Sequence, residues 1–316
     1  MAKNASKILV TGGAGFIGSH LIPRLIESGY SVTVLDNLSS GKKENLNQLL
    51  NHPKFKLIVQ DIRDHSLSRD ALKDVSTLVH LAAQIDVTAS VADPVLTNDI
   101  NVTGTLNMLK EAAKSRVRRF VFASSTAVYG DAQEMPVKEH TPLKPISPYA
   151  ASKAAAEAYC SAFATSFGIE TVALRFFNVY GPKNENSPYS GVITKFLRQA
   201  LRGEVLTVEG DGEQTRDFIH VSDVAEALTL AVSARGIRSE TINICTGVPT
   251  SVNGLVTALG KVTERNLRVK HAPARVGDVR FSYGDGSKAA QKLGFKPQIN
   301  ILKGLALLYE QQKLTL

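Results

Sequence analysis

Tyr149 and Lys153 are the two residues whose types and spacing most directly suggest chemistry. They stand four positions apart in a segment, 147–167, that we predict to be a helix, so their side chains share one face. A tyrosine with an ordinary pKa of about 10 is seldom a base at neutral pH, but a nearby ammonium group favours its phenolate form. We therefore expect Tyr149 to act as an acid/base with Lys153 beside it.

The Tyr/Lys spacing alone is weak evidence. With eight tyrosines in the chain, about half a chance match is expected, and Tyr309/Lys313 is indeed a second pair. That pair lies in LALLYEQQKL, which an amphipathic surface helix explains. The helix of Tyr149 is better marked, because Ser147 can cap it, Pro148 suits its first turn and Gly168 can end it.

Three hydroxyl side chains close a predicted strand at RFVFAS, residues 119–124. Ser124, Ser125 and Thr126 would lie at the carboxyl edge of the sheet, where doubly wound folds bind their ligands. Taken alone they are typical of a turn after a strand. Together with the Tyr/Lys helix, they indicate groups that could relay protons.

The segment TGGAGFIGSHL follows a predicted strand at 7–11 and opens a helix. It contains Gly13-x-Gly15-x-x-Gly18 and also Gly12-x-x-Gly15-x-x-Gly18. Such a turn needs residues without Cβ, so that the backbone and the helix N-terminus can approach a pyrophosphate. A purely structural turn is the alternative, but the strand before it and the helix after it favour a dinucleotide site.

Asp36 ends the second predicted strand, about 20 residues after the glycine turn. A carboxylate there can accept hydrogen bonds from both adenosine ribose hydroxyls and would repel a 2′-phosphate, so we predict NAD rather than NADP. The alternative is an Asp that merely starts the loop DNLSSG. The positive nicotinamide ring would also favour the phenolate of Tyr149, and Lys153 could bind the nicotinamide ribose.

Short β-branched runs alternate with helix-like segments over the first half of the chain, which predicts an α/β fold with a doubly wound parallel sheet of the Rossmann type. The predicted strands are 7–11, 31–36, 55–61, 77–82, 119–124 and 170–177, and the predicted helices are 16–28, 94–115 and 147–167.

After residue 177 the chain becomes rich in Gly, Pro and Asn, and DFIHV (217–221), a helix (222–234) and TINICT (241–246) then resume the α/β rhythm. We expect this stretch to return to the first sheet. The prediction is therefore an NAD-binding domain at 1–177 plus 217–247 and a smaller C-terminal α/β substrate domain at 178–216 plus 248–316.

Composition excludes several classes of protein. The net charge of +8 comes from scattered basic residues, and a chain without Trp and with 6% aromatic residues is poorly suited to stacking on nucleic acid. Cys160 and Cys245 have no metal-ligand spacing, so we expect no metal site. No segment approaches the roughly 20 apolar residues of a membrane span, and the N-terminus resembles no signal peptide, so we expect a cytoplasmic protein.

Five motifs, TGGAGFIGSHL, SSTAVYG, SPYAASK, RFFNVYGP and RDFIHVSDVA, together resemble the extended short-chain dehydrogenase/reductases of the NAD-dependent epimerase/dehydratase family, most nearly its UDP-hexose 4-epimerases. The resemblance covers nearly the whole chain. It implies that Tyr149 takes the proton of the sugar 4-hydroxyl while C4 gives hydride to NAD⁺. The 4-keto sugar then turns over and receives hydride on its other face. Ser125 and Lys153 match the serine and the lysine of that family.

The same resemblance implies further contacts. Besides Gly12, Gly15, Gly18, Asp36, Tyr149 and Lys153, the cofactor contacts are Phe16, Ile17, Asn37, Asp61, Ile62, Leu81, Ala82, Gln84, Asn101 and Ser124. An Asp after a strand and an Asn within NVTGT need no ligand to explain them, so Asp61 and Asn101 also have a purely structural interpretation. Besides Ser125 and Tyr149, the substrate contacts are Thr126, Asn178, Val192, Arg216, Arg275, Asp278 and Ser282. Two arginines suit an anionic diphosphate.

The choice of reaction depends on the turn after Ser125. Dehydratases of the family carry Asp and Glu at the positions of Thr126 and Ala127, and decarboxylases place Glu in this turn, so the resemblance favours simple epimerisation. The small Ser282 stands where a bulky residue excludes 2-acetamido sugars, so UDP-GlcNAc/UDP-GalNAc could be accepted besides UDP-glucose/UDP-galactose.

Other readings stay open. They are a UDP-glucuronate 4-epimerase, a decarboxylase or dehydratase, and an NAD-sensing binding protein that has lost its chemistry. The family also implies a homodimer formed through 94–115 and 147–167.

Overall fold

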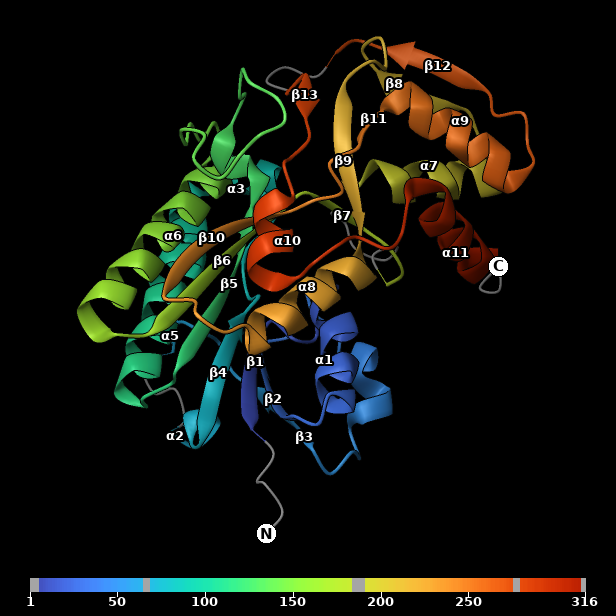
Figure 1. The fold of residues 1–316 in the computed structure, drawn as a ribbon. Helices are drawn as coiled ribbons and strands as arrows, with labels where there is room; N and C mark the ends of the chain where they lie inside the picture. Colours follow the sequence, from blue (N-terminus) through green and yellow to red (C-terminus); the bar gives the residue numbers. More distant parts are fainter. Residues whose placement is uncertain (1–5, 65–68, 184–190, 275–278, 314–316) are drawn as a thin grey trace.

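A seven-stranded parallel sheet forms the centre of the molecule (Figure 1). The computed structural model describes residues 6–64, 69–183, 191–274 and 279–313. The strand order is β10-β6-β5-β4-β1-β2-β3, so the order reverses between β1 and β4, as in a doubly wound Rossmann fold. The strands are β1 Lys7–Thr11, β2 Ser31–Asp36, β3 Phe55–Val59, β4 Val75–His80, β5 Arg119–Ser125, β6 Glu170–Phe176 and β10 Ser239–Ile244.

Helices cover both faces of this sheet, which explains why its strands are apolar on both sides. In β1, Ile8 and Val10 pack toward α1 (Gly18–Glu27), α8 (Val221–Ser233) and α10 (Ser287–Leu293), whereas Leu9 packs toward the opposite face. That opposite face is covered by α5 (Gly104–Lys114) and α6 (Pro148–Phe167), and Figure 1 shows the two groups of helices on either side of the sheet. The predicted fold class is confirmed.

Local signals set the helices that carry the site. Ser147 accepts a hydrogen bond from the N–H of Ala150 (3.1 Å), and Gly168 ends α6 with a φ of +71°. The helix predicted over 94–115 is a run of α4 (Pro94–Asn98), a π-helix at Asp99–Thr103 and α5. The short helices before it are α2 (Arg69–Leu72) and α3 (Val87–Ala92), and 3-10 turns span Lys43–Leu49 and Thr126–Tyr129.

A second, smaller region packs against the carboxyl ends of the large sheet. In its four-stranded sheet, β9 (Thr215–His220) pairs with β7 (Asn178–Tyr180), β11 (Pro249–Ser251) and β13 (Phe281–Ser282). A parallel pair of β8 (Leu206–Glu209) and β12 (Val269–Ala272) accompanies it. Helices α7 (Val192–Leu201), α9 (Val252–Thr263) and α11 (Ile301–Lys313) share one apolar core with β7, β8 and β9.

The stretch 217–247 is divided between the two regions. As expected, β10 joins the large sheet beside β6, and α8 packs on the same core as α1. The expectation that DFIHV also returns to the first sheet is wrong, because β9 lies in the four-stranded sheet. The domain boundaries at 177/178, 216/217 and 247/248 stay a prediction.

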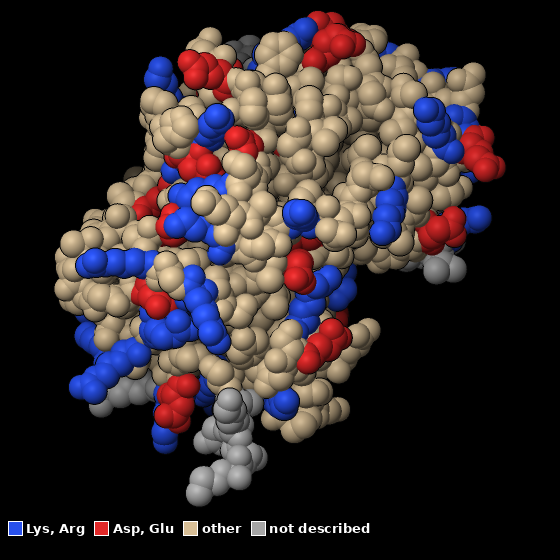
Figure 2. Space-filling model, viewed as in Figure 1, with Lys and Arg blue, Asp and Glu red and all other residues tan. Residues whose placement is uncertain are grey.

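Within the described ranges, no helix is long and apolar enough to cross a membrane, and no group of His, Cys, Asp and Glu could hold a metal ion. Cys160 and Cys245 are both buried free thiols. Figure 2 shows Lys and Arg side chains interspersed with Asp and Glu on the face that it displays, without a continuous basic surface there.

Candidate active site

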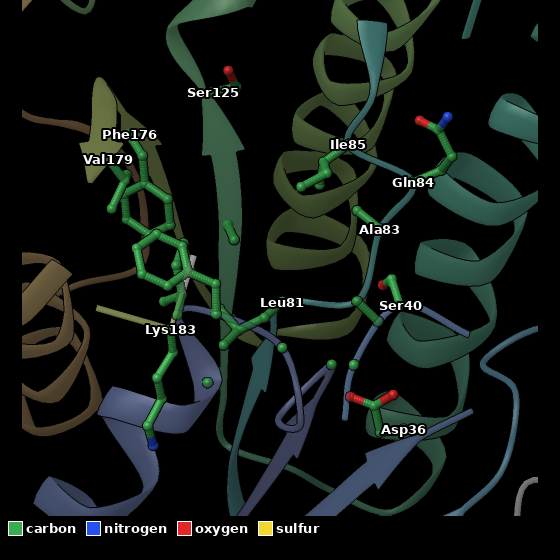
Figure 3. Close-up of a pocket in the computed structure, with 18 of the residues that line it drawn as sticks. Asp36, Ser40, Leu81, Ala83, Gln84, Ile85, Ser125, Phe176, Val179 and Lys183 are labelled. Carbon is green, nitrogen blue, oxygen red and sulfur yellow. The ribbon is translucent and has the colours of Figure 1, made fainter. Parts of the chain in front are cut away.

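A cavity of about 940 Å³ opens at the carboxyl ends of β1, β2, β4, β5 and β6 (Figure 3). This is the edge at which a doubly wound sheet binds ligands, next to the point where the strand order reverses. The cavity brings together most of the residues that we predicted from the sequence: Gly12, Gly15, Phe16, Ile17, Gly18, Asp36, Asn37, Asp61, Ile62, Leu81, Ala82, Gln84, Ser124, Ser125, Tyr149, Lys153, Asn178 and Val192.

Four of the predicted site residues that lie in the described part of the structure do not line this cavity. They are Asn101, Thr126, Arg216 and Ser282. Arg216 and Ser282 are register partners on β9 and β13, so the structure does bring these two together. Arg275 and Asp278 lie outside the described residues.

The glycine turn is packed too tightly for side chains. Gly12 has a φ of +68°, and a Cβ there would lie 2.6 Å from the backbone nitrogen of Ala82. A Cβ on Gly18 would lie 2.5 Å from the Cα of Gly13, so its absence lets α1 start against β1. No described side chain caps the start of α1, and Gly15, Ile17 and Gly18 line the cavity there, so the helix N-terminus lies where a pyrophosphate could be bound.

Asp36 lies at the end of β2 and is only 7% exposed, but its carboxylate faces the cavity (Figure 3). It accepts hydrogen bonds from the N–H groups of Ala14 and Leu38, both at 2.9 Å. Each carboxylate oxygen can accept further bonds, so ribose hydroxyls can still be bound. A Cβ at Gly41 would come within 3.0 Å of Oδ1, so this glycine keeps the space beside the carboxylate open.

Asp61 also lines the cavity but is held by protein groups. Arg63 donates from Nε to Oδ1 (3.0 Å) and from Nη2 to Oδ2 (2.9 Å), and Asn37 donates to Oδ2 (2.7 Å). These bonds, led by the Arg63 side chain, hold the pKa of Asp61 well below its ordinary value. Asp61 is therefore a fixed negative charge at the end of the cavity near Asp36.

Asn101 lies behind the cavity wall. Its Oδ1 accepts from the N–H of Gln84 (2.7 Å), and its Nδ2 donates to the carbonyl of Gln84 (2.9 Å) and to Oγ of Ser152 (2.9 Å). With both amide hydrogens engaged, its role in this structure is to hold the wall segment at Gln84 against α6. The structural interpretation of NVTGT is therefore the one that the hydrogen bonds support.

A histidine that the sequence analysis did not single out extends this support. Thr105 donates its hydroxyl hydrogen to the carbonyl of Asn101 (2.6 Å), so it accepts from Nε2 of His80 (3.0 Å), and Nδ1 of His80 then accepts from Thr11 (2.7 Å). Burial lowers the pKa of His80 to about 3, so the ring is neutral. The chain of bonds connects the start of the glycine turn to Asn101.

The three predicted catalytic residues meet in the cavity. Tyr149 and Ser125 both line it, and the Ser125 side chain lies close enough to the Tyr149 hydroxyl to lower its pKa. Lys153 donates from Nζ to the carbonyl of Ala123 (2.9 Å), and Nζ lies 6.0 Å from the centre of the Tyr149 ring. The N–H of Tyr149 is bound by Oγ of Ser90 (3.1 Å), which fixes the start of α6.

The protein groups alone keep Tyr149 protonated. Burial raises its pKa, and the Ser125 side chain offsets this only in part. Burial also lowers the pKa of Lys153 to about 8, with Glu157 and Cys160 acting in the opposite direction. We expected Lys153 to lower the Tyr149 pKa, but in this structure the Tyr149 pKa is set by burial and by Ser125. A phenolate at Tyr149 therefore requires additional positive charge in the cavity.

Several wall residues went unpredicted. Lys183, which follows β7, donates to the carbonyl of Asn45 (3.3 Å), and the Asn45 amide donates to the carbonyl of Ala14 in the glycine turn (2.8 Å). Phe176, Ile85 and Ala83 line the wall as well, as Figure 3 shows. An apolar side chain or a single lysine in a loop carries no local signal of this role. These residues become part of the cavity wall only because the two regions of the fold pack against each other.

Charge is distributed unevenly along the cavity. Of the described residues that line it, the carboxylates are Asp36 and Asp61, and both lie at the ends of β2 and β3. Around Tyr149 and Ser125 the described wall is made of hydroxyl, amide and apolar side chains together with Lys153.

Comparison with known proteins gives consistent results. The model of the NAD dependent epimerase/dehydratase family matches residues 8–245. A UDP-glucose 4-epimerase of Mycolicibacterium smegmatis is 37% identical over 302 residues, which cover 95% of this chain and 96% of that protein.

Two solved structures are similar along nearly their whole length. One is a UDP-N-acetylglucosamine 4-epimerase from Methanobrevibacter ruminantium M1 in complex with UDP-N-acetylmuramic acid (TM-score 0.93, 39% identity, 99% of this chain and 100% of that chain). The other is a UDP-glucose 4-epimerase from Thermotoga maritima with UDP-glucose (TM-score 0.91, 40% identity, 98% and 99%). With the family model, the fold and the cavity in agreement, this chain belongs to the NAD-dependent epimerase/dehydratase family.

Proposed function

We propose that this protein is an NAD-dependent UDP-hexose 4-epimerase that interconverts UDP-glucose and UDP-galactose through a 4-keto sugar. One observation carries the proposal. Tyr149, Ser125 and Lys153 share a cavity with the glycine turn, and the described part of the wall around them has no carboxylate. Epimerisation needs only a group that exchanges one proton with the 4-oxygen and a hydride acceptor.

The residues of the cavity fit NAD. Gly12 and Gly18 allow the tight backbone packing that a pyrophosphate-binding turn needs, and Asp36 offers acceptors to ribose hydroxyls while it opposes a 2′-phosphate. When bound, NAD supplies reversible hydride transfer and, in its oxidised form, a positive ring. The described residues of the cavity supply neither a hydride acceptor nor a positive ring.

The catalytic roles follow from the arrangement of the cavity. Tyr149 takes the proton from the 4-hydroxyl of the sugar and returns it after the sugar has turned. Ser125, which lies beside Tyr149 in the cavity, is placed to hydrogen-bond the same 4-oxygen. Lys153, whose Nζ lies 6.0 Å from the centre of the Tyr149 ring, is placed to bind the nicotinamide ribose, and the oxidised nicotinamide would supply the further positive charge that the phenolate needs.

A second substrate pair is proposed because of Ser282. This small side chain is half-buried on β13, opposite Arg216 in the register of the small sheet. If it forms the pocket wall expected from the family resemblance, a 2-acetamido group has room, and UDP-GlcNAc/UDP-GalNAc should also turn over. Turnover of the non-acetylated pair alone, with Ser282→Tyr having no effect on either pair, would rule out this extension.

Other reactions of the family are less consistent with the described wall. A dehydratase needs an acid for the leaving hydroxyl, and a decarboxylase of the family carries Glu in the turn after Ser125. Here that turn contains Thr126 and Ala127. An NAD-sensing binding protein would not require Ser125, Tyr149 and Lys153 in one cavity. Mass-resolved product analysis with UDP-glucose and UDP-glucuronate separates these alternatives, since an epimer keeps the substrate mass.

We also propose a homodimer. Large apolar side chains are exposed on the helices of the expected interface, where Val95 on α4 is 78% exposed and Phe167 on α6 is 61% exposed. The neighbouring α3 adds Val91, which is 64% exposed. Such side chains grouped on neighbouring helices are typical of association surfaces. Light scattering of the purified protein tests this, and Val95→Glu should shift the mass to that of a monomer.

A cytoplasmic location, finally, is consistent with the two free buried thiols.

The function is tested by incubating purified protein with UDP-glucose and identifying products by chromatography. The expected result is an equilibrium mixture of UDP-glucose and UDP-galactose. This mixture should form with a stoichiometric amount of NAD and no other cofactor. A product of different mass, or no product from any UDP-hexose, would contradict the proposal.

A further inference from the structure

A buried ion pair lies directly behind the catalytic side chains. Glu157, one helical turn after Lys153 on α6, accepts from Arg175 on β6 at two points: Nε to Oε1 (2.9 Å) and Nη2 to Oε2 (2.6 Å). The two side chains are 7% and 5% exposed, and neither lines the cavity. Removing two charges from water is costly, so such a pair is weak evidence for stability alone. Its contacts with neighbouring residues indicate another role.

Glu157 is hydrogen-bonded to one residue of the cavity wall and lies one helical turn from a second. Its Oε1 also accepts the hydroxyl hydrogen of Ser124, the residue just before Ser125. Its negative charge raises the pKa of Lys153, which burial alone would lower further. Ser124 and Lys153 both line the cavity, so one buried carboxylate acts on two wall residues.

Among the groups that face Lys153 from the elements packed around it, Glu157 supplies the negative charge. Burial keeps the Cys160 thiol protonated and His80 neutral, and the Tyr149 pKa is raised. The titratable and charged groups that face Lys153 are Tyr149, Glu157 and Cys160 on α6, His80 on β4 and Arg175 on β6.

The carboxylate of Glu157 is held rigidly. Beyond its two bonds to Glu157, Arg175 donates from Nη1 to the Tyr129 hydroxyl (2.8 Å) and to the carbonyl of Glu139 (3.1 Å). The Tyr129 hydroxyl in turn donates to Oδ1 of Asn243 on β10 (2.7 Å). The guanidinium is therefore fixed from several sides, and it fixes the carboxylate below Lys153.

We propose that Glu157, held in place by Arg175, is a positioning residue that keeps the Lys153 side chain charged and directed into the cavity. It acts through Lys153 and Ser124 and does not touch the reacting atoms. The kinetic part of this inference rests on the proposed epimerase function, whereas the charge state of Lys153 can be measured without any substrate.

The direct test is a titration of Lys153 by NMR in protein labelled with ¹³C at the lysine ε-carbon, with the signal assigned by its loss in Lys153→Met. Glu157→Gln alone leaves the Arg175 charge buried without its partner and could prevent folding. The informative variant is therefore Glu157→Gln combined with Arg175→Met, which removes both charges and fills the space with an unbranched apolar side chain. We expect the Lys153 titration to move to lower pH by about one unit in this double variant.

A matched control is Glu170→Gln combined with Arg119→Met. Glu170, which is 29% exposed, pairs with the fully buried Arg119 at the opposite end of β5 (Nη2 to Oε2, 2.7 Å), so this variant also removes both charges of an ion pair, but far from Lys153. The Lys153 titration should be unchanged there. In the dependence of kcat on pH, the fall in kcat at basic pH should move to lower pH in the Glu157→Gln/Arg175→Met variant and not in the control.

An unchanged Lys153 titration in the folded Glu157→Gln/Arg175→Met variant would overturn the proposal, as would an equal shift in the Glu170→Gln/Arg119→Met control. A wild-type protein with no epimerase activity would contradict the proposed function instead, and the titration would still decide this inference.

Discussion

The carboxylate of Asp36 accepts a hydrogen bond from the backbone N–H of Ala14 at 2.9 Å, so the residue predicted to bind ribose also holds the glycine turn. The turn and the second strand are therefore one unit. A change at Asp36 affects the position of the pyrophosphate site as well as the adenosine site.

Asp36→Asn should weaken NAD binding without creating a preference for NADP. The amide keeps one acceptor but loses the negative charge and places an NH₂ group near the N–H groups of Ala14 and Leu38. Calorimetric titration with both cofactors measures this. Wild-type protein should bind NAD more tightly than NADP, and equal or tighter NADP binding would refute the proposed role of Asp36.

Tyr149→Phe should lower kcat by about 10²- to 10⁴-fold, the usual contribution of a positioned acid/base. NAD binding should persist, because the glycine turn and Asp36 are unchanged. Tyr309→Phe is a matched control, since its ring also lies 6.0 Å from a lysine Nζ, that of Lys313, but belongs to the core of the second region. Turnover by Tyr149→Phe at the wild-type rate would exclude this tyrosine as the acid/base.

Gly12→Ala should abolish NAD binding and destabilise the fold. Its φ is +68°, and the added Cβ would meet backbone atoms of Leu81 and Ala82 within 3.0 Å. Gly168→Ala is a control that adds backbone strain without a steric collision. The φ of Gly168 is +71°, but no atom lies within 4 Å of an added Cβ. We expect the control to lose only about 1–2 kcal/mol of unfolding free energy and to keep NAD. Equal effects of the two substitutions in thermal melts and NAD titrations would show that steric collision at Gly12 is unimportant.

His80 should make the protein less stable in acid. Its pKa is about 3 when folded, below the ordinary value near 6.5, so protonation favours the unfolded chain. This contribution to stability is complete above pH 6.5 and is lost as the pH falls toward 3. Between about pH 7.5 and pH 5.5, the loss amounts to about 1.4 kcal/mol.

The measurement is guanidinium unfolding of wild type and His80→Gln at both pH values. Other buried histidines, such as His220 with a pKa of about 4, contribute equally to both proteins, so the difference between the two isolates His80. The His80→Gln variant should lose about 1.4 kcal/mol less than wild type. An identical pH dependence would show that His80 is not the group responsible.

Much of the fold could be predicted because its signals are local. The central strands of the large sheet, such as β1, β5 and β6, are apolar runs buried on both faces, and α6 has a capping serine and a terminal glycine. The placement of β9 could not be predicted in this way. Its sequence DFIHV resembles the other strands, and its partners β7, β11 and β13 are segments of only two or three residues, with too short a pattern to detect.

The site was predictable where backbone geometry demands a residue type, as at Gly12 and Gly18. It was less so where the role depends on distant contacts. The sequence does not show that the Asn101 amide is bound to Gln84 and Ser152, and its predicted contact with the cofactor stays a prediction. Glu157 and Arg175 resemble solvated surface charges in the sequence, and only the packing of α6 against β6 shows that they form a buried pair.

The most direct test of the central claim is the fate of the hydrogen at C4. The protein is incubated with UDP-glucose that carries deuterium at C4, and the UDP-galactose formed is analysed by NMR. The account predicts that the deuterium stays at C4 of the product, with no net accumulation of NADH, because hydride leaves and returns at the same carbon. Loss of the label to solvent, or one NADH formed per sugar consumed, would contradict it.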